Sequence, residues 1–230
     1  MDSKNAISKR LESEIPSHAA GLDVYLGGTG PIYNAINGQI TKDLSKSELL
    51  SIPLTLVMLL IVFGSLVAAG QPLLVGLSAI GMSLLGLLGF TYFTDISVFS
   101  LNLLTGLGLG LGIDYSLLIV SRFREELAGG ADVPTAVATT VHTAGRTVMF
   151  SGFSVAITLS GMFFFPQPFL RSFGYAGVLV CLLAVFGALV PLPALLRVLG
   201  PRIDKFKVRK HIPTPKDDGR WAQLAHFELI

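Results

Sequence analysis

The sequence predicts an all-α polytopic membrane protein: a bundle of five transmembrane helices with a short extracytoplasmic α/β remnant. Of its 230 residues, 51% are hydrophobic and only 14% are charged, whereas soluble domains carry about 25% charged residues. The deficit is concentrated between Leu50 and Leu196, where only nine charged residues occur. A soluble core of this length would lack the polar surface it needs, and a bilayer removes that need.

Five apolar runs have the length of a membrane span, for which a helix needs about 20 residues. They lie at residues 50–69, 72–92, 98–120, 147–165 and 173–196. The first two runs are separated by Gly70-Gln71 alone, which predicts a tight hairpin at that point. A polar link, Ser121–Arg146, separates the third run from the fourth, and its part from Pro134 to Thr143 is predicted as a short amphipathic helix at the interface.

The flanking segments set the expected orientation. The link before the fourth run carries Arg122, Arg124 and Arg146, and residues 198–230 form a basic tail, so the positive-inside rule places both in the cytoplasm. Residues 1–49 then lie outside, with a weak strand expected at Asp23–Leu26 and a helix from Pro31 to Lys46. No preceding span is present to translocate this segment. We therefore expect a fragment or one piece of a split protein.

One ionisable side chain lies within the third run. Asp114 precedes Arg122 by eight residues, and an ionised carboxylate at this depth costs at least about 2.5 kcal/mol. It must therefore face the bundle interior, pair with another group or be protonated, and the glycines of this run lead us to expect it at the centre of a bundle. Burial disfavours the charged form, so a buried carboxylate can load and release a proton near neutral pH. The hydroxyl of Tyr115 can donate to or accept from that carboxylate. The pair predicts a proton relay; the alternatives are a structural polar contact for Asp114 and simple helix packing for Tyr115.

Small and hydroxyl-bearing residues surround this pair in the sequence. Glycines in the third run form two small-xxx-small pairs on different sides of the helix, and they predict close approach by more than one neighbour; these are Gly106 with Gly110 and Gly108 with Gly112. A hydroxyl stripe on the fourth run supplies second-rank relay candidates: Ser151, Ser154 and Thr158, preceded by Thr147. These hydroxyls either reach the Asp–Tyr pair or a file of water, or bond back to their own helix carbonyls.

Other classes of protein find little support. A net charge of +2 is too small to indicate nucleic-acid binding, and Gly106-x-Gly108 is no dinucleotide motif because it lies inside an apolar run. The sequence has no metal cluster and no nucleophile–base pair beside the spans, so we expect neither an enzyme, nor a cofactor, nor a metal site. Cys181 lies in an apolar run and is expected to be a small buried hydrophobe.

The segment from Gly112 to Glu126 closely resembles the fourth transmembrane helix of MMPL-family transporters, a branch of the RND superfamily. The resemblance continues through residues 147–154, 165–170 and 199–204, and covers roughly Leu50 to Asp204. It implies that the five runs match transmembrane helices two to six of the family's N-terminal half, with residues 1–49 as the end of a porter domain. It also implies proton relay by Asp114 and Tyr115, with a second such pair in a C-terminal half that this chain lacks.

The resemblance implies a transporter in the plasma membrane (the bacterial inner membrane), driven by the proton motive force and exporting lipids or other hydrophobic molecules. The expected partners are membrane lipids, the hydrophobic substrate, and either a partner half or a second copy of the chain. The alternative is a protein that does not transport: a truncated remnant, a membrane scaffold or a lipid-binding subunit.

Overall fold

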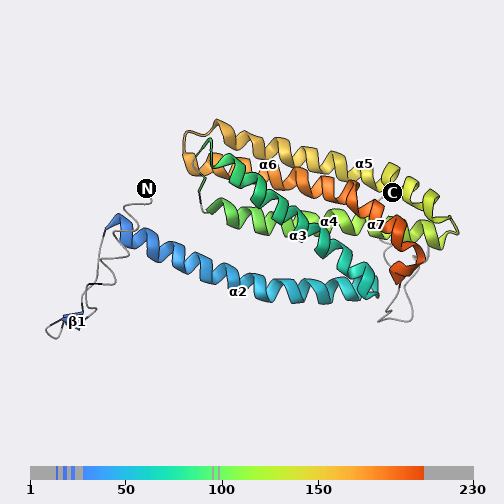
Figure 1. The fold of residues 1–230 in the computed structure, drawn as a ribbon, viewed down its shortest axis with the longest axis horizontal. Coiled ribbons are helices and arrows are strands. Elements are labelled where there is room, and N and C mark those ends of the chain that lie inside the picture. Colours follow the sequence, from blue (N-terminus) through green and yellow to red (C-terminus); the bar gives the residue numbers. More distant parts are fainter. Residues whose placement is uncertain are drawn as a thin grey trace, which may run out of the picture. The chain divides into compact units, whose positions relative to one another are not determined.

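Long apolar runs favour helices in lipid, because a helix satisfies its backbone hydrogen bonds within the segment. In agreement, the computed structural model is largely helical (Figure 1). It describes residues 14, 18–19, 22–23, 28–94, 96–97 and 99–204. For some of the residues before 49, it describes the backbone alone. The elements are β1 (His18–Ala19), β2 (Leu22–Asp23), α2 (Thr29–Phe63), α3 (Leu66–Phe90), α4 (Phe99–Ala128), α5 (Val133–Ser160), η1 (Gly161–Phe164), α6 (Pro168–Leu189), α7 (Pro191–Leu199) and η2 (Gly200–Asp204).

The chain divides into two units, Met1–Thr55 and Leu56–Ile230, with the boundary inside α2. In the first unit, β1 pairs with β2 in an antiparallel register that sets His18 opposite Asp23. The helix predicted from Pro31 to Lys46 is confirmed as part of α2. Of the strand expected at Asp23–Leu26, Asp23 belongs to β2 and the rest lies outside the described residues. The extracytoplasmic α/β remnant stays a prediction.

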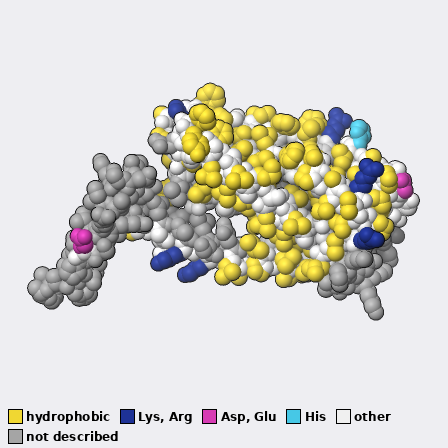
Figure 2. All heavy atoms as spheres, in the orientation of Figure 1, with side chains coloured by type: hydrophobic (Ala, Val, Ile, Leu, Met, Phe, Trp, Pro, Cys, Tyr) yellow, Lys and Arg dark blue, Asp and Glu magenta, His cyan; other side chains and the backbone are white. Residues whose placement is uncertain are grey.

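The second unit is a bundle in which α6 packs against each of α3, α4 and α5 (Figure 1). Its core joins side chains from α2 to α7 and from η2, including Phe63 at the end of α2, Phe123 on α4 and Ile203 in η2. Its surface exposes many large apolar side chains, as expected of helices solvated by acyl chains. Figure 2 shows these hydrophobic side chains over the middle of the visible face, with charged groups gathered toward the ends.

The first hairpin is not where the sequence predicted it. Gly70-Gln71 lies inside α3, and the chain reverses instead at Gly64-Ser65, between α2 and α3. Gly64 adopts a φ of +63°, a left-handed conformation that glycine reaches without steric cost. The prediction was wrong because Gly64 is surrounded by apolar residues, so hydropathy does not reveal the turn, whereas Gly-Gln-Pro is a typical turn signal.

Relocating the turn changes the number of spans. Among the described residues, four helices are long and apolar enough to cross a membrane: Leu66–Phe90, Phe99–Ala128, Val133–Phe164 and Pro168–Ile203. The first predicted span included Gly64 to Ala69, which belong to the turn and to α3. What remains of it, Leu49–Phe63, is a shorter apolar helix. The prediction of an all-helical membrane bundle is confirmed, and the count of five full-length spans is not.

The polar link between the third and fourth runs is also helical over most of its length. α4 continues to Ala128 and α5 begins at Val133, so the predicted interfacial helix is the first part of α5. The chain turns at Gly130, whose φ is +89°. Arg124 on α4 donates a hydrogen bond of 2.9 Å to the carbonyl of Phe63, where the last turn of α2 lacks intrahelical donors. A charged side chain of α4 thereby fixes the end of α2.

The last predicted span is broken near its end. α6 stops at Leu189 and α7 begins at Pro191, because proline disfavours helical geometry at the residue before it. α7 buries Leu192 and Leu196, and η2 then buries Ile203. The carbonyl of Ile203 accepts a hydrogen bond of 2.8 Å from the hydroxyl of Ser65. The basic residues after 204 lie outside the described part of the chain.

The position of the turn can be tested with two alanine substitutions. Gly64→Ala forces a Cβ into a left-handed conformation and should destabilise the protein by about 1–2 kcal/mol. Gly70→Ala should not destabilise it, because Gly70 is helical and nothing lies within 4 Å of a Cβ built there. Thermal unfolding in detergent measures both. A greater loss for Gly70→Ala than for Gly64→Ala would contradict the observed turn.

Candidate functional site

The rotation of α4 is set by close contact with its neighbours. A Cβ built on Gly108 would lie 2.7 Å from Ile80 of α3 and 2.8 Å from Val180 of α6. A Cβ on Gly112 would collide with the backbone of Gly76 on α3. Gly108 and Gly112 thus have close neighbours on α3, and Gly108 also has one on α6. The packing of α3 on α4 is therefore a backbone-to-backbone contact.

The other glycine pair lies on an open face. Gly106 and Gly110 have nothing within 4 Å of a Cβ built on them, and both are exposed in the described chain. Asp114 and Leu118 continue this face at the same four-residue spacing and are exposed as well. We call Gly106, Gly110, Asp114 and Leu118 the open face of α4. The expectation that Gly106 and Gly110 pack against a helix of this bundle is wrong for the described chain.

Asp114 lies near the midpoint of α4, and its side chain is exposed. We expected it to face the interior of this bundle, and that expectation is wrong. The physical reason is the α3–α4 contact: two residues after Gly112, a helix has turned by about 200°, so Asp114 is directed away from α3. Among the described residues, Asp114 has neither an ion pair nor a hydrogen bond with its carboxylate.

Tyr115, in contrast, is inside the bundle, with only 3% of its surface exposed. Its hydroxyl has no hydrogen-bond partner of good geometry among the described residues. Ser151 of α5 and Cys181 of α6 are its polar neighbours. A Cβ on Gly152 would lie 3.5 Å from the hydroxyl oxygen, so this glycine makes room for the phenol. The three helices α4, α5 and α6 therefore meet at the Tyr115 hydroxyl.

The hydroxyl stripe of α5 is exposed at Ser151, Ser154 and Thr158. Only Ser151 is brought to the Asp–Tyr pair, through Tyr115. Thr158 donates a hydrogen bond of 2.9 Å to the carbonyl of Ser154 in its own helix. For Thr158, the alternative that a hydroxyl bonds back to its own helix therefore holds. The stripe thus does not act as one unit in the described chain.

Two members of this site were not predicted as functional residues. Cys181 is fully buried, as expected of a small hydrophobe, and its thiol donates to the carbonyl of Gly152 over 3.2 Å. Gly152 shares the buried face of α5 with Gly145, Val148 and Ala156. That pattern of small residues opposite the hydroxyl stripe was the available signal. Among the described residues, no group of His, Cys, Asp and Glu could hold a metal ion.

Taken together, the apolar helices, the lipid-type surface and an ionisable group at mid-helix define a multi-pass integral membrane protein. Comparison with known proteins identifies its family. The sequence profile of the MMPL family matches residues 1–228, so the chain belongs to the MMPL family. The resemblance found in the sequence is thereby confirmed, as is the assignment to the cell membrane.

Three relatives illustrate the relationship. The chain is 45% identical over 205 residues to a membrane protein of Streptomyces coelicolor, covering 89% of this chain and 28% of that protein. It is 41% identical over 199 residues to the trehalose monomycolate exporter MmpL3 of Mycobacterium tuberculosis, covering 85% of this chain and 21% of the exporter. It is 33% identical over 202 residues to the mycolic acid-containing lipids exporter MmpL11 of Mycolicibacterium smegmatis, covering 84% and 21%.

The matched region is only a part of each relative. The chain spans between a fifth and three tenths of the length of these relatives. The names of all three describe membrane proteins or exporters, and none describes an enzyme. Because the match covers only part of each relative, it assigns the family of this chain and not an activity.

The two glycine pairs of α4 predict opposite responses to the same substitution. Gly112→Ala places a Cβ against the backbone of Gly76, which cannot move aside as a flexible side chain would. We therefore expect the free energy of unfolding to fall by about 1–3 kcal/mol from overpacking. Gly110→Ala is the matched control and should leave stability unchanged, since its Cβ meets open space. Thermal unfolding of the detergent-solubilised chain measures both. Equal behaviour of the two variants would refute the assigned rotation of α4.

Proposed function

We propose that this chain forms part of a transporter that uses the proton motive force to export lipids or other hydrophobic molecules, with Asp114 carrying the proton. The observation that supports it best is the carboxylate of Asp114 at the middle of a membrane-spanning helix, where it has no partner among the described residues. Such a group is costly in lipid, and ionisable side chains at this depth generally serve transport or proton transfer. Two of the relatives are lipid exporters by name, which gives the substrate class.

The proposed relay begins at Asp114 and includes Tyr115, the next residue of α4. A carboxylate accepts a proton when the group is desolvated and releases it when water or a cation approaches. Tyr115 is adjacent in sequence but lies inside the bundle, where its hydroxyl neighbours Ser151 and Cys181. Ser151 is the second-rank member supported by this geometry. Ser154 and Thr158 have no contact with the pair that would support a role for them.

The exposure of Asp114 supports a partner on the open face of α4. A carboxylate facing acyl chains is unfavourable, whereas the same group against a second helix bundle is buried and can be paired. Gly106 and Gly110 lie on the same face, and small residues are what a transmembrane helix presents to a close neighbour. We propose that a partner half, or a second copy of this chain, covers the open face. Alternating movement of the two halves would then change the surroundings of Asp114.

The charge distribution supports the orientation inferred from the sequence. The described cations Arg122 and Arg124 lie in the last two turns of α4, and Arg197 and Arg202 follow the end of α6. We propose that this end of the second unit faces the cytoplasm. Asp114 would then load its proton from the opposite side and release it toward the arginines.

Replacing the carboxylate tests the proton carrier. Asp114→Asn keeps the size of the side chain but cannot ionise, so transport of a fluorescent lipid driven by an imposed pH gradient in membrane vesicles should fall to the background of vesicles without the protein. Asp132→Asn, at the exposed start of α5, is the matched control and should keep wild-type transport. Immunoblotting of the vesicles verifies equal insertion. Undiminished transport by inserted Asp114→Asn would exclude Asp114 as the carrier.

Cysteine cross-linking tests the partner on the open face. In a Cys181→Ser background, Gly110→Cys should form a disulfide with a cysteine on a copy of the chain or on a co-expressed second half. Leu85→Cys, on a lipid-facing position of α3 with 69% exposure, should not. Non-reducing gel electrophoresis of native membranes separates the products. Equal cross-linking at both positions, or at neither, would contradict a specific partner at the open face.

A further inference from the structure

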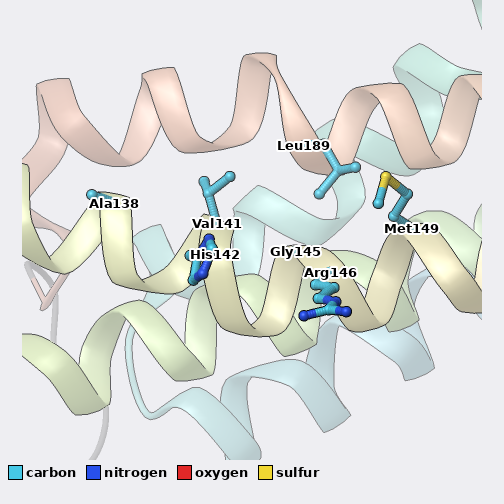
Figure 3. Close-up of a pocket in the computed structure, with 7 residues that line it drawn as sticks. All are labelled: Ala138, Val141, His142, Gly145, Arg146, Met149 and Leu189. Atoms are coloured by element: carbon cyan, nitrogen blue, oxygen red, sulfur yellow. The ribbon is translucent and has the colours of Figure 1, made fainter.

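A pocket of about 550 Å³ opens between α5 and α6. Figure 3 shows Val141 and Met149 directed from α5 toward α6, Leu189 directed from α6 toward α5, and His142 and Arg146 beside them on α5. Gly145 forms the floor, where an added Cβ would lie 3.1 Å from Leu189. The pocket therefore has an apolar wall next to two nitrogen-bearing side chains one helical turn apart.

Arg146 is available to an anion. The carboxylates of Glu125 and Glu126 at this end of the bundle are both paired with Arg122. Arg146 is exposed, lies 5.6 Å from the ring centroid of Phe150, and forms no ion pair within the described part of the chain. A planar guanidinium in this situation presents several donors to solvent and can bind two oxygens of a phosphate at once.

The pocket lies where the apolar parts of two helices end. On α5, Gly145 is two turns, or roughly 10 Å, from Gly152, which packs beside the Tyr115 hydroxyl. On α4, the same distance from Tyr115 leads to Arg122, the first charged residue after Asp114. Both helices therefore become charged at the same level. Charged residues at the end of the apolar part of a span favour the headgroup level, with acyl chains on the side of Tyr115.

We propose that this pocket binds an anionic membrane phospholipid, with the phosphate on Arg146 and His142 and the upper acyl segment against Val141, Met149 and Leu189. The two kinds of lining decide the occupant. A soluble phosphate would contact Arg146 and His142 but leave the apolar wall in contact with water, whereas a phospholipid fills both parts at once. The site is separate from Asp114, and the proposal does not depend on the proposed transport function.

Binding of defined lipids to the purified full chain tests the proposal. The detergent-solubilised protein is titrated with dioleoyl-phosphatidylglycerol or with dioleoyl-phosphatidylcholine, and bound lipid is counted by native mass spectrometry. Phosphatidylglycerol should bind more tightly. Arg146→Gln should weaken it roughly five-fold, the effect of about one Lys or Arg beside an anionic headgroup. Arg146→Lys keeps the charge and should retain most of the binding, and His142→Gln should weaken it less than Arg146→Gln does.

Arg171→Gln is the matched control, because it removes one exposed positive charge at the other end of α6. It should bind phosphatidylglycerol as the wild type does. A third arm adds soluble glycerol 1-phosphate, which should not displace the lipid. The proposal is overturned by equal binding of the two lipids, by unchanged binding in Arg146→Gln, by an equal loss in Arg171→Gln, or by displacement with glycerol 1-phosphate. Thermal unfolding of each variant verifies that it is folded.

Discussion

The backbone contact between Gly112 of α4 and Gly76 of α3 determines how the candidate site is presented. It fixes the face of α4 that is buried, and the helical repeat then assigns every other side chain of that helix to a direction. Tyr115 is turned into the bundle and Asp114 out of it because of this one contact. A larger side chain at either glycine would rotate or displace α4, and the two neighbouring residues would exchange or lose their surroundings.

The resulting arrangement separates two chemically different neighbours. The phenol of Tyr115 is held among small residues, Gly152 and Cys181, in a site with little room for water. The carboxylate of Asp114 lies on a glycine-lined surface that another helix can approach closely. An acid and a hydroxyl that are adjacent in sequence thus belong to different interfaces, one inside this bundle and one on its surface. This division is why we propose that the working unit is larger than the described helices.

The sequence predicted the class of fold and the residue pair of the candidate site better than it predicted where the helices begin and end. Hydropathy identified the apolar runs because the bilayer imposes a composition on every residue of a span. It did not locate Gly64, since a turn of two residues inside an apolar region leaves no polar signal, and it read Gly70-Gln71-Pro72 as a turn where α3 is continuous. The direction of the Asp114 side chain could not be predicted from the sequence either. The four glycines allow two opposite rotations of α4, and the contact with Gly76 selects one of them. Cys181 and Gly152 escaped notice as site residues since each is an unremarkable packing residue until Tyr115 is placed beside them.

The hydrogen bond from Ser65 to Ile203 has a consequence for the order of assembly. The carbonyl that accepts from Ser65 belongs to a residue 138 positions later in the chain. The hairpin of α2 and α3 is therefore synthesised before Ile203 and before Arg124 of α4, whose hydrogen bonds tie the hairpin to the rest of the bundle. The contact with Ile203 is the later of these two to form. A stop codon a few residues before Ile203 would leave all the apolar helices intact and yet remove this closing contact.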